Sequence, residues 1–271
     1  MQKLTTPFLI LLPAVAFLFS RCTYRAYYQS PFHGSSETYH AIPLRSDSLK
    51  SATYVSGVFT GGGANHNLRD NVFSFTGSVY RSHNFGDFQG FYGLSGSLGS
   101  YDVAEYSGYE PYGGGTTTLY TPDPGNKFFG GYSGSGGINF VLPFGRGSEW
   151  RVIGTSFTLQ KEFGDYQRFR KSVPDSLANS IFNNNLIGVL GVSTEFAFRT
   201  RHGMIGYKLM LSQDVINGNS HYRGYDSAQY GRVIFQQTLS FRRDRVTGSV
   251  QFNVGDRLFN AQLGVGYRLG R

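Results

Sequence analysis

The sequence predicts an all-β protein: a single antiparallel transmembrane β-barrel of about ten strands, within a range of about 8 to 12, with up-and-down topology. Three observations predict this fold. Short segments alternate between polar and apolar residues, their connections alternate between long and short, and the composition is rich in glycine and aromatic residues but poor in charge. Charged residues make up 15% of the 271 residues, against about 25% in soluble domains.

The alternation is clearest in the last two segments, about 246–254 and 259–269. In the first, Val250 and Phe252 share one face and Gln251 lies on the other. In the second, Leu263 and Val265 share one face in the same way. A strand with one face in lipid and the other toward a lumen has this period of two.

Eight earlier segments show the same pattern, although the facing of the first is ambiguous. Each has roughly 10 residues, the length that crosses a bilayer at a tilt. The ten predicted strands span about 51–60, 72–81, 87–98, 130–141, 150–161, 187–199, 203–212, 229–241, 246–254 and 259–269.

The connections are sorted by length along the chain. Long ones, at 61–71, 99–129, 162–186 and 213–228, alternate with short ones at 82–86, 142–149, 200–202 and 242–245, and only 255–257 breaks the trend. Outer-membrane barrels place long loops outside and short turns, with both termini, in the periplasm. Strand alternation alone also suits a soluble β-sandwich, which is the alternative fold.

The N-terminus predicts export. Lys3 precedes an apolar run at 7–20, and Cys22, the single cysteine, follows at once. This resembles a lipoprotein signal peptide at 1–21, with lipidation at Cys22, although Phe19 and Arg21 replace the usual Leu and small residue. One cysteine excludes an intramolecular disulfide. Residues 22–49 are predicted to form an extended periplasmic tether and 50–271 the barrel.

Several segments together resemble a known family. They are the signal peptide ending at Cys22, the tether through Ala41-Ile-Pro-Leu44, and the strands KSATYVSGVFT and NVFSFTGSVYRSHNFGDFQGFYG. They are similar to small outer-membrane β-barrel lipoproteins of Bacteroidota, which implies location and fold but no chemistry. The chain departs from the family by ending at Arg271 rather than on an aromatic residue, and no acidic cluster follows Cys22. The second departure implies a lipid anchor left on the periplasmic leaflet.

Four charges fall on the predicted lumen face: Glu195, Lys208, Arg232 and Arg268. An unpaired charge in a narrow lumen is costly, so we expect an ion network in which Glu195 pairs with Lys208. Open channels need about 16 strands, so about ten strands favour a closed barrel. The alternative is that these charges line a small solute pore.

We expect no catalytic residues, no cofactor and no metal site. The glycine runs lack the context of phosphate loops, and the six histidines lack metal-ligand spacing. The alternative is a lipid- or peptide-hydrolysing enzyme at the outer rim, where His221 is near Asp214, Ser220 and Asp226 in the sequence.

The favoured function is structural or interactive, with loops 99–129, 162–186 and 213–228 facing outward. The loop Tyr101–Phe128 is rich in tyrosine, which suits a contact with a protein partner or an aromatic girdle; its tyrosines are Tyr101, Tyr106, Tyr109, Tyr112 and Tyr120. Outer-membrane lipid is the other expected partner, and arginines near the short turns suit lipid phosphates. The net charge of +8 comes without a nucleic-acid-binding motif, and the sequence leaves the oligomeric state open.

Overall fold

A computed structural model describes residues 26–47, 49–65, 68–105, 107–112, 115–145, 147–216, 222–223 and 233–270. For 107–112, 115–120 and 222–223, and for Ser176 and Asn179, it describes only the backbone. The predicted signal peptide and Cys22 lie outside the described residues.

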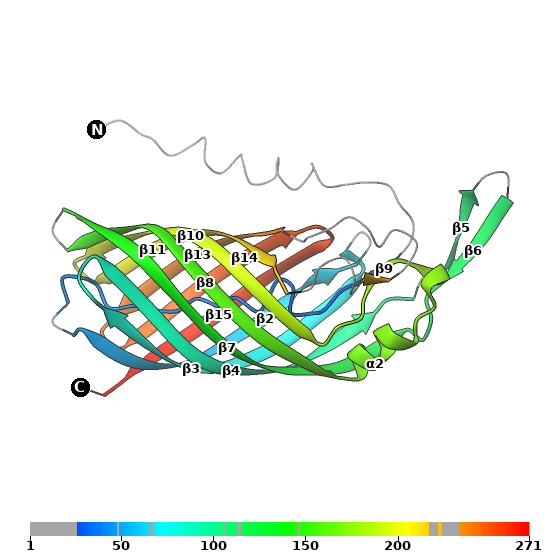
Figure 1. The fold of residues 1–271 in the computed structure, drawn as a ribbon, viewed down its shortest axis with the longest axis horizontal. Coiled ribbons are helices and arrows are strands. Elements are labelled where there is room, and N and C mark those ends of the chain that lie inside the picture. Colours follow the sequence, from blue (N-terminus) through cyan, green and yellow to red (C-terminus); the bar gives the residue numbers. More distant parts are fainter. Residues whose placement is uncertain are drawn as a thin grey trace.

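Ten antiparallel strands close into one barrel, which confirms the predicted fold class (Figure 1). In chain order they are β2 (Ser51–Ala64), β3 (Asp70–Asn84), β4 (Phe88–Val103), β7 (Gly125–Phe144), β8 (Ser148–Gly164), β10 (Leu186–Thr200), β11 (Gly203–Asp214), β13 (Val233–Arg243), β14 (Val246–Gly255) and β15 (Leu258–Leu269). Each pairs with its neighbours in sequence, and β15 pairs with β2 to close the barrel.

The two faces of the wall are sorted by polarity, as the alternation predicts. On the outside, Phe75 is 58% and Leu94 is 72% exposed. On the inside, small polar side chains bond across neighbouring strands: Thr76 and Ser97 lie 2.8 Å apart, and the Thr238 hydroxyl donates to Gln251 at 3.0 Å. An apolar outer face over a hydrogen-bonded polar lumen is the arrangement of a membrane barrel.

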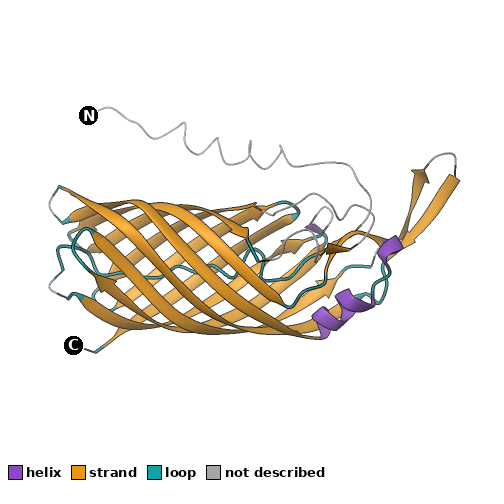
Figure 2. Cartoon of the chain, viewed as in Figure 1, coloured by secondary structure: helices purple, strands orange, loops and turns teal. Residues whose placement is uncertain are grey.

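The two ends of the barrel differ, as the loop lengths predict (Figure 2). One end, here called the short-turn end, carries the tight turns after β3, β7, β10 and β13, together with the last described residue, Gly270. Three of these turns contain left-handed backbone, at Gly86 (φ 89°), Gly145 (φ 59°) and Asp244 (φ 53°). The other end, here called the long-loop end, carries the longer connections, and the tight β14–β15 turn is its exception.

The long-loop end has secondary structure of its own. A hairpin, β5 (Ser107–Tyr112) and β6 (Gly115–Tyr120), projects away from the barrel, and helix α2 (Asp165–Ser172) with the 3₁₀ helix η2 (Asp175–Leu177) follows β8 (Figure 1). Strands β1 (Ala26–Tyr28), β9 (Ala178–Phe182) and β12 (Tyr222–Arg223) form a small separate sheet. Among the described residues, no helix is long and apolar enough to span a membrane.

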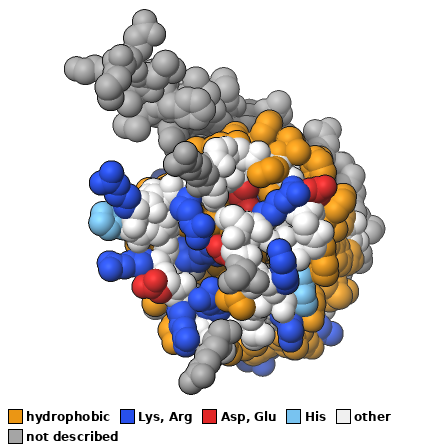
Figure 3. All heavy atoms as spheres, turned by 90° about the vertical axis from the view of Figure 1, so that its left-hand side faces the viewer, with side chains coloured by type: hydrophobic (Ala, Val, Ile, Leu, Met, Phe, Trp, Pro, Cys, Tyr) orange, Lys and Arg blue, Asp and Glu red, His pale blue; other side chains and the backbone are white. Residues whose placement is uncertain are grey.

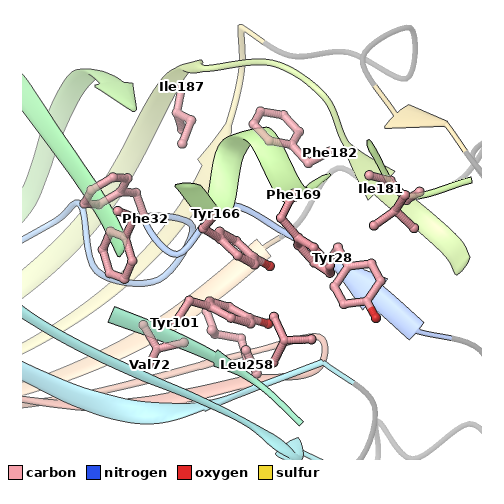
Figure 4. Close-up of a cluster of buried hydrophobic side chains, with 14 of the residues drawn as sticks. Tyr28, Phe32, Val72, Tyr101, Tyr166, Phe169, Ile181, Phe182, Ile187 and Leu258 are labelled. Atoms are coloured by element: carbon pink, nitrogen blue, oxygen red, sulfur yellow. The ribbon is translucent and has the colours of Figure 1, made fainter. Parts of the chain in front are cut away.

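A buried apolar cluster closes the barrel at the long-loop end (Figure 4). We call it the aromatic cap; it includes Tyr28, Phe32, Val72, Tyr101, Phe129, Tyr166, Phe169, Ile181, Phe182, Ile187 and Leu258. Helix α2 contributes Tyr166, which stacks on Tyr101 with ring centroids 3.8 Å apart, and Phe169, which meets Tyr28 edge-on at 5.1 Å. These contacts join the loops, the barrel wall and the N-terminal segment into one core.

The structure places the predicted tether inside the barrel. Residues 26–47, here called the plug segment, run along the lumen (blue in Figure 1), and those from Tyr27 to Leu44 are buried apart from the partly exposed Ser36 and His40. The prediction of an extended periplasmic tether at 22–49 is therefore wrong for these residues. The physical reason is space: side chains fill the interior of about 8 strands, and ten strands leave room that an extended chain can occupy.

Candidate functional site: a lumen filled by the plug segment

The backbone of the plug segment is hydrogen-bonded to the barrel wall along the length of the lumen. Gln262 donates to the Ser35 carbonyl at 3.3 Å, and Gln251 donates to the Glu37 carbonyl at 2.9 Å. The Ala41 amide donates to the Tyr80 hydroxyl at 2.9 Å. Buried backbone N–H and C=O groups need hydrogen-bond partners. Here the polar side chains of the lumen supply them, as neighbouring strands do in a sheet.

Near the long-loop end, charged side chains fasten the plug segment. The Ser30 hydroxyl donates to Glu162 at 2.7 Å, and the same carboxylate oxygen of Glu162 accepts from Arg170 of α2 at 2.7 Å. Arg170 is fully buried and lies over the ring of Tyr166, 5.0 Å from its centroid. Glu162 therefore joins the plug segment to the helix that covers the lumen.

In the middle of the lumen, Arg151 of β8 is the centre of a buried charge cluster. Its guanidinium donates to Glu149 at 2.8 Å and to Glu195 at 2.7 Å. These three side chains are at most 5% exposed. Arg151 also donates to the Ile42 carbonyl at 3.3 Å, and Tyr39 donates its hydroxyl to Glu195 at 3.0 Å. The cluster thus binds both the wall and the plug segment.

A β-bulge explains why Glu149 and Arg151 point inward. In β8, pairing with β7 passes from Ile153 directly to Arg151 and leaves Val152 without a partner. The extra residue reverses which positions face the lumen. Toward the long-loop end, Ser156 and Thr158 face inward; beyond the bulge, Glu149 and Arg151 do. Sequence reasoning missed both charges because strict alternation across a bulge assigns them to the wrong face.

The ion-pair partner of Glu195 is Arg151, and the predicted pair with Lys208 is wrong. The two residues are direct neighbours across β10 and β11, as predicted. The Glu195 carboxylate, however, is bonded to Arg151 and Tyr39. Lys208 adds a positive charge that attracts both Glu195 and Glu37 of the plug segment. The lumen therefore holds a buried charge network, with Arg151 rather than Lys208 as its main cation.

The remaining predicted site residues are spread over different places. Arg268 is partly exposed and lines the cavity at the short-turn end rather than the closed lumen. Cys22, Arg232 and His221 lie outside the described residues. Tyr101, predicted as part of a contact loop, belongs to β4 instead; it is 1% exposed and donates to Asp70 at 2.9 Å.

Five of the fourteen residues that line the cavity at the short-turn end are arginines. Its volume is about 770 Å³, and Figure 3 shows Lys and Arg side chains gathered on this face. Arg242, near the short turn after β13, is buried: it donates to the Ile42 carbonyl at 3.1 Å and to Asp47 at 3.0 Å. Arg199 also donates to Asp47, at 3.3 Å. Asp47 thereby fastens the C-terminal end of the plug segment.

The described part of the chain has no candidate metal-binding cluster. No three His, Cys, Asp or Glu side chains there form a cluster fit for a metal ion. Asp214, the one described member of the predicted rim group, faces the plug segment, where its carboxylate lies 3.4 Å from the His33 ring. Asp214 is thus one more wall residue that contacts the plug segment.

Comparisons with known proteins show similarity to barrels of the outer membrane. No family model and no curated protein matches the sequence. A solved outer membrane channel from Pseudomonas putida F1 matches with a TM-score of 0.41 and 9% identity, over 85% of this chain and 98% of the other. The translocator domain of the Neisseria meningitidis autotransporter NalP matches with a TM-score of 0.39 and 11% identity, over 81% and 89%. The β-domain of the Bordetella autotransporter BrkA gives 0.37 and 14%, over 82% and 100%. The assignment of the barrel rests on its own strand pairing.

Proposed function

We propose that this protein is an outer-membrane barrel that is closed by its own N-terminal segment and has a structural or interaction role, with its long-loop end outside the cell. The observation that carries the proposal is the plug segment, which is hydrogen-bonded to the wall from one end of the lumen to the other. A lumen filled in this way leaves no continuous path for solute.

The exposed apolar side chains on the outside of the barrel support a location in the membrane. Apolar side chains such as Phe75, Leu94, Tyr132 and Leu263, each more than half exposed, cover neighbouring strands around the barrel. Soluble monomers rarely expose apolar patches larger than a few hundred Å². Contact with lipid instead of water makes this apolar surface favourable. In lipid, only helices and closed barrels satisfy all their backbone hydrogen-bonding groups.

The long-loop end supports an interaction role. The β5–β6 hairpin extends beyond the barrel (Figure 1) and, among the described strands, pairs only with itself, from Ser107 opposite Tyr120 to Tyr112 opposite Gly115. An isolated two-stranded hairpin is only marginally stable in water. A protein partner that packs against the hairpin would stabilise it, so we place the contact surface there rather than at Tyr101.

The proposal keeps two sequence expectations that concern residues outside the described part of the chain, export by residues 1–21 and lipidation of Cys22. It also keeps the resemblance to lipoproteins of Bacteroidota. It includes no catalytic step. Hydrolysis of lipid or peptide that is lost in His221→Ala but retained in His202→Ala would contradict it. His202 is the matched control because it lies exposed in the turn after β10, at the short-turn end.

Conductance in planar lipid bilayers tests the proposal. The full chain, shown to be folded by a heat-dependent shift in gel mobility, should insert without stepwise channel openings. A variant lacking residues 26–47, checked by the same gel shift, should conduct because its lumen is no longer filled. Stable openings of the folded full chain would contradict the closed-barrel proposal, whatever the variant does.

A further inference from the structure

We propose that the mature N-terminus lies at the cell surface, on the side of the long loops, because the chain passes outward through the lumen of its own barrel. The inference rests on the proposed function, since it needs the long-loop end to be outside. It reverses the sequence-based expectation of a periplasmic N-terminus and of a lipid anchor in the periplasmic leaflet.

The direction of the plug segment carries the inference. Its first described residues meet the long-loop end: β1 pairs in parallel with β9, and the Tyr27 amide donates to Asn65 at 2.6 Å. Gln29 donates to the Asp256 carbonyl, in the turn between β14 and β15, at 3.2 Å. The chain therefore enters the barrel at the end that carries the long loops.

Its last residues meet the short-turn end. Asn84, the last residue of β3, donates to the Leu44 carbonyl at 2.9 Å, and the Arg45 amide donates to Glu149 at 2.8 Å. The barrel wall then begins with β2 at Ser51, which leads back toward the long-loop end. Residues 26 and 51 thus lie at opposite ends of the barrel.

The reach of the chain fixes the side on which Cys22 must lie. Only four peptide steps separate Cys22 from Ala26, and four residues extend at most about 14 Å. The hydrocarbon core is about 30 Å thick, so this stretch cannot return across the membrane beside the barrel. A lipid on Cys22 would insert into the outer leaflet, at the cell surface.

The filled lumen also sets an order of events. A lipidated N-terminus cannot pass through a barrel that is already closed, because the lumen is occupied by Arg151, Glu195 and the plug segment itself. The plug segment must be in place before β15 pairs with β2. The barrel therefore closes around its own N-terminal segment.

Site-specific proteolysis of intact cells tests the topology. Three variants each carry one cleavage site for a selective protease: between Tyr24 and Arg25, between Tyr112 and Gly115 in place of the two intervening glycines, or after Arg271. A heat-dependent gel shift confirms that each is folded. We expect the first two to be cut by protease added to intact cells, and the third to be cut only after the outer membrane is permeabilised.

The outcomes separate the inference from the proposed function. Cleavage of the hairpin site in intact cells, with the N-terminal site cut only after permeabilisation, would overturn the inference and leave the proposed function standing. Protection of the hairpin site in intact cells would contradict the proposed orientation itself. If the N-terminal insertion prevents folding, trypsin decides on the unmodified chain: a new N-terminus at Ala26 in intact cells, absent in Arg25→Gln, supports the inference, and its appearance only after permeabilisation overturns it.

Discussion

Replacing Arg151 by methionine should strongly destabilise the barrel. Methionine keeps a flexible apolar stem without the charge, so Glu149 and Glu195 remain buried without their main cation. Both carboxylates are at most 5% exposed, so water does not screen their unpaired charges. Removing one partner of a buried ion pair costs about 3–5 kcal/mol, mainly because a buried charge is left unpaired. This corresponds to a decrease of roughly two to four powers of ten in the folding equilibrium constant.

The single tryptophan provides the assay. Trp150 precedes Arg151, stacks on Phe196 with ring centroids 5.3 Å apart, and donates to Thr194 at 2.9 Å. Its fluorescence should follow urea unfolding of the barrel from lipid vesicles, and the shift in the midpoint gives the loss of stability. The matched control is Arg243→Met, since the Arg243 side chain is 70% exposed and an exposed pair contributes about 0–1 kcal/mol.

A variant that lacks all three charges of the cluster is the second test. In Arg151→Met combined with Glu149→Gln and Glu195→Gln, no charge of the cluster remains, so most of the lost stability should return. Loss of less than about 1 kcal/mol in Arg151→Met, the size of an exposed pair, would refute the reasoning. A triple variant no more stable than Arg151→Met would refute it as well.

Two further substitutions test the wall. Leu94→Arg, at a lipid-facing position that is 72% exposed, should cost about 2–4 kcal/mol near the bilayer midplane, whereas Leu269→Arg at the strand end should cost about 0–1 kcal/mol; equal shifts in the urea midpoint would argue against a lipid-facing band. Gly62→Ala should cost about 1–3 kcal/mol, because a Cβ there would lie 2.5 Å from the Cβ of Asn260. Gly96→Ala, with no atom within 4 Å of its Cβ, is the matched control, and equal stability of the two variants would contradict the packing.

The sequence predicts the wall of the barrel well because lipid enforces a strict pattern. Residues such as Phe75 and Leu94 must be apolar wherever they face the membrane, so a period of two marks the strands and their facing. Loop length then distinguishes the two ends. Both signals are local, and together they predict the ten strands.

The contents of the lumen leave a weaker trace in the sequence. An extended segment surrounded by the wall has no lipid face, so residues 26–47 show no alternation and look like a tether. Their burial depends on Gln251, Gln262 and Arg151, which lie more than a hundred residues away. The bulge at Val152 hides Glu149 and Arg151 in a similar way. The i, i+2 spacing of this acid and base was the one local sign that they share a face.

Hydrogen–deuterium exchange of the unmodified protein tests the central claim, a lumen filled by the plug segment. Residues 27–44 are buried apart from the partly exposed Ser36 and His40, and the Ala41 amide is bonded to the Tyr80 hydroxyl. The account predicts that peptides from this segment exchange as slowly as those from the barrel strands. Complete exchange of 26–47 within seconds, while β14 and β15 remain protected, would show a free tether and contradict the account.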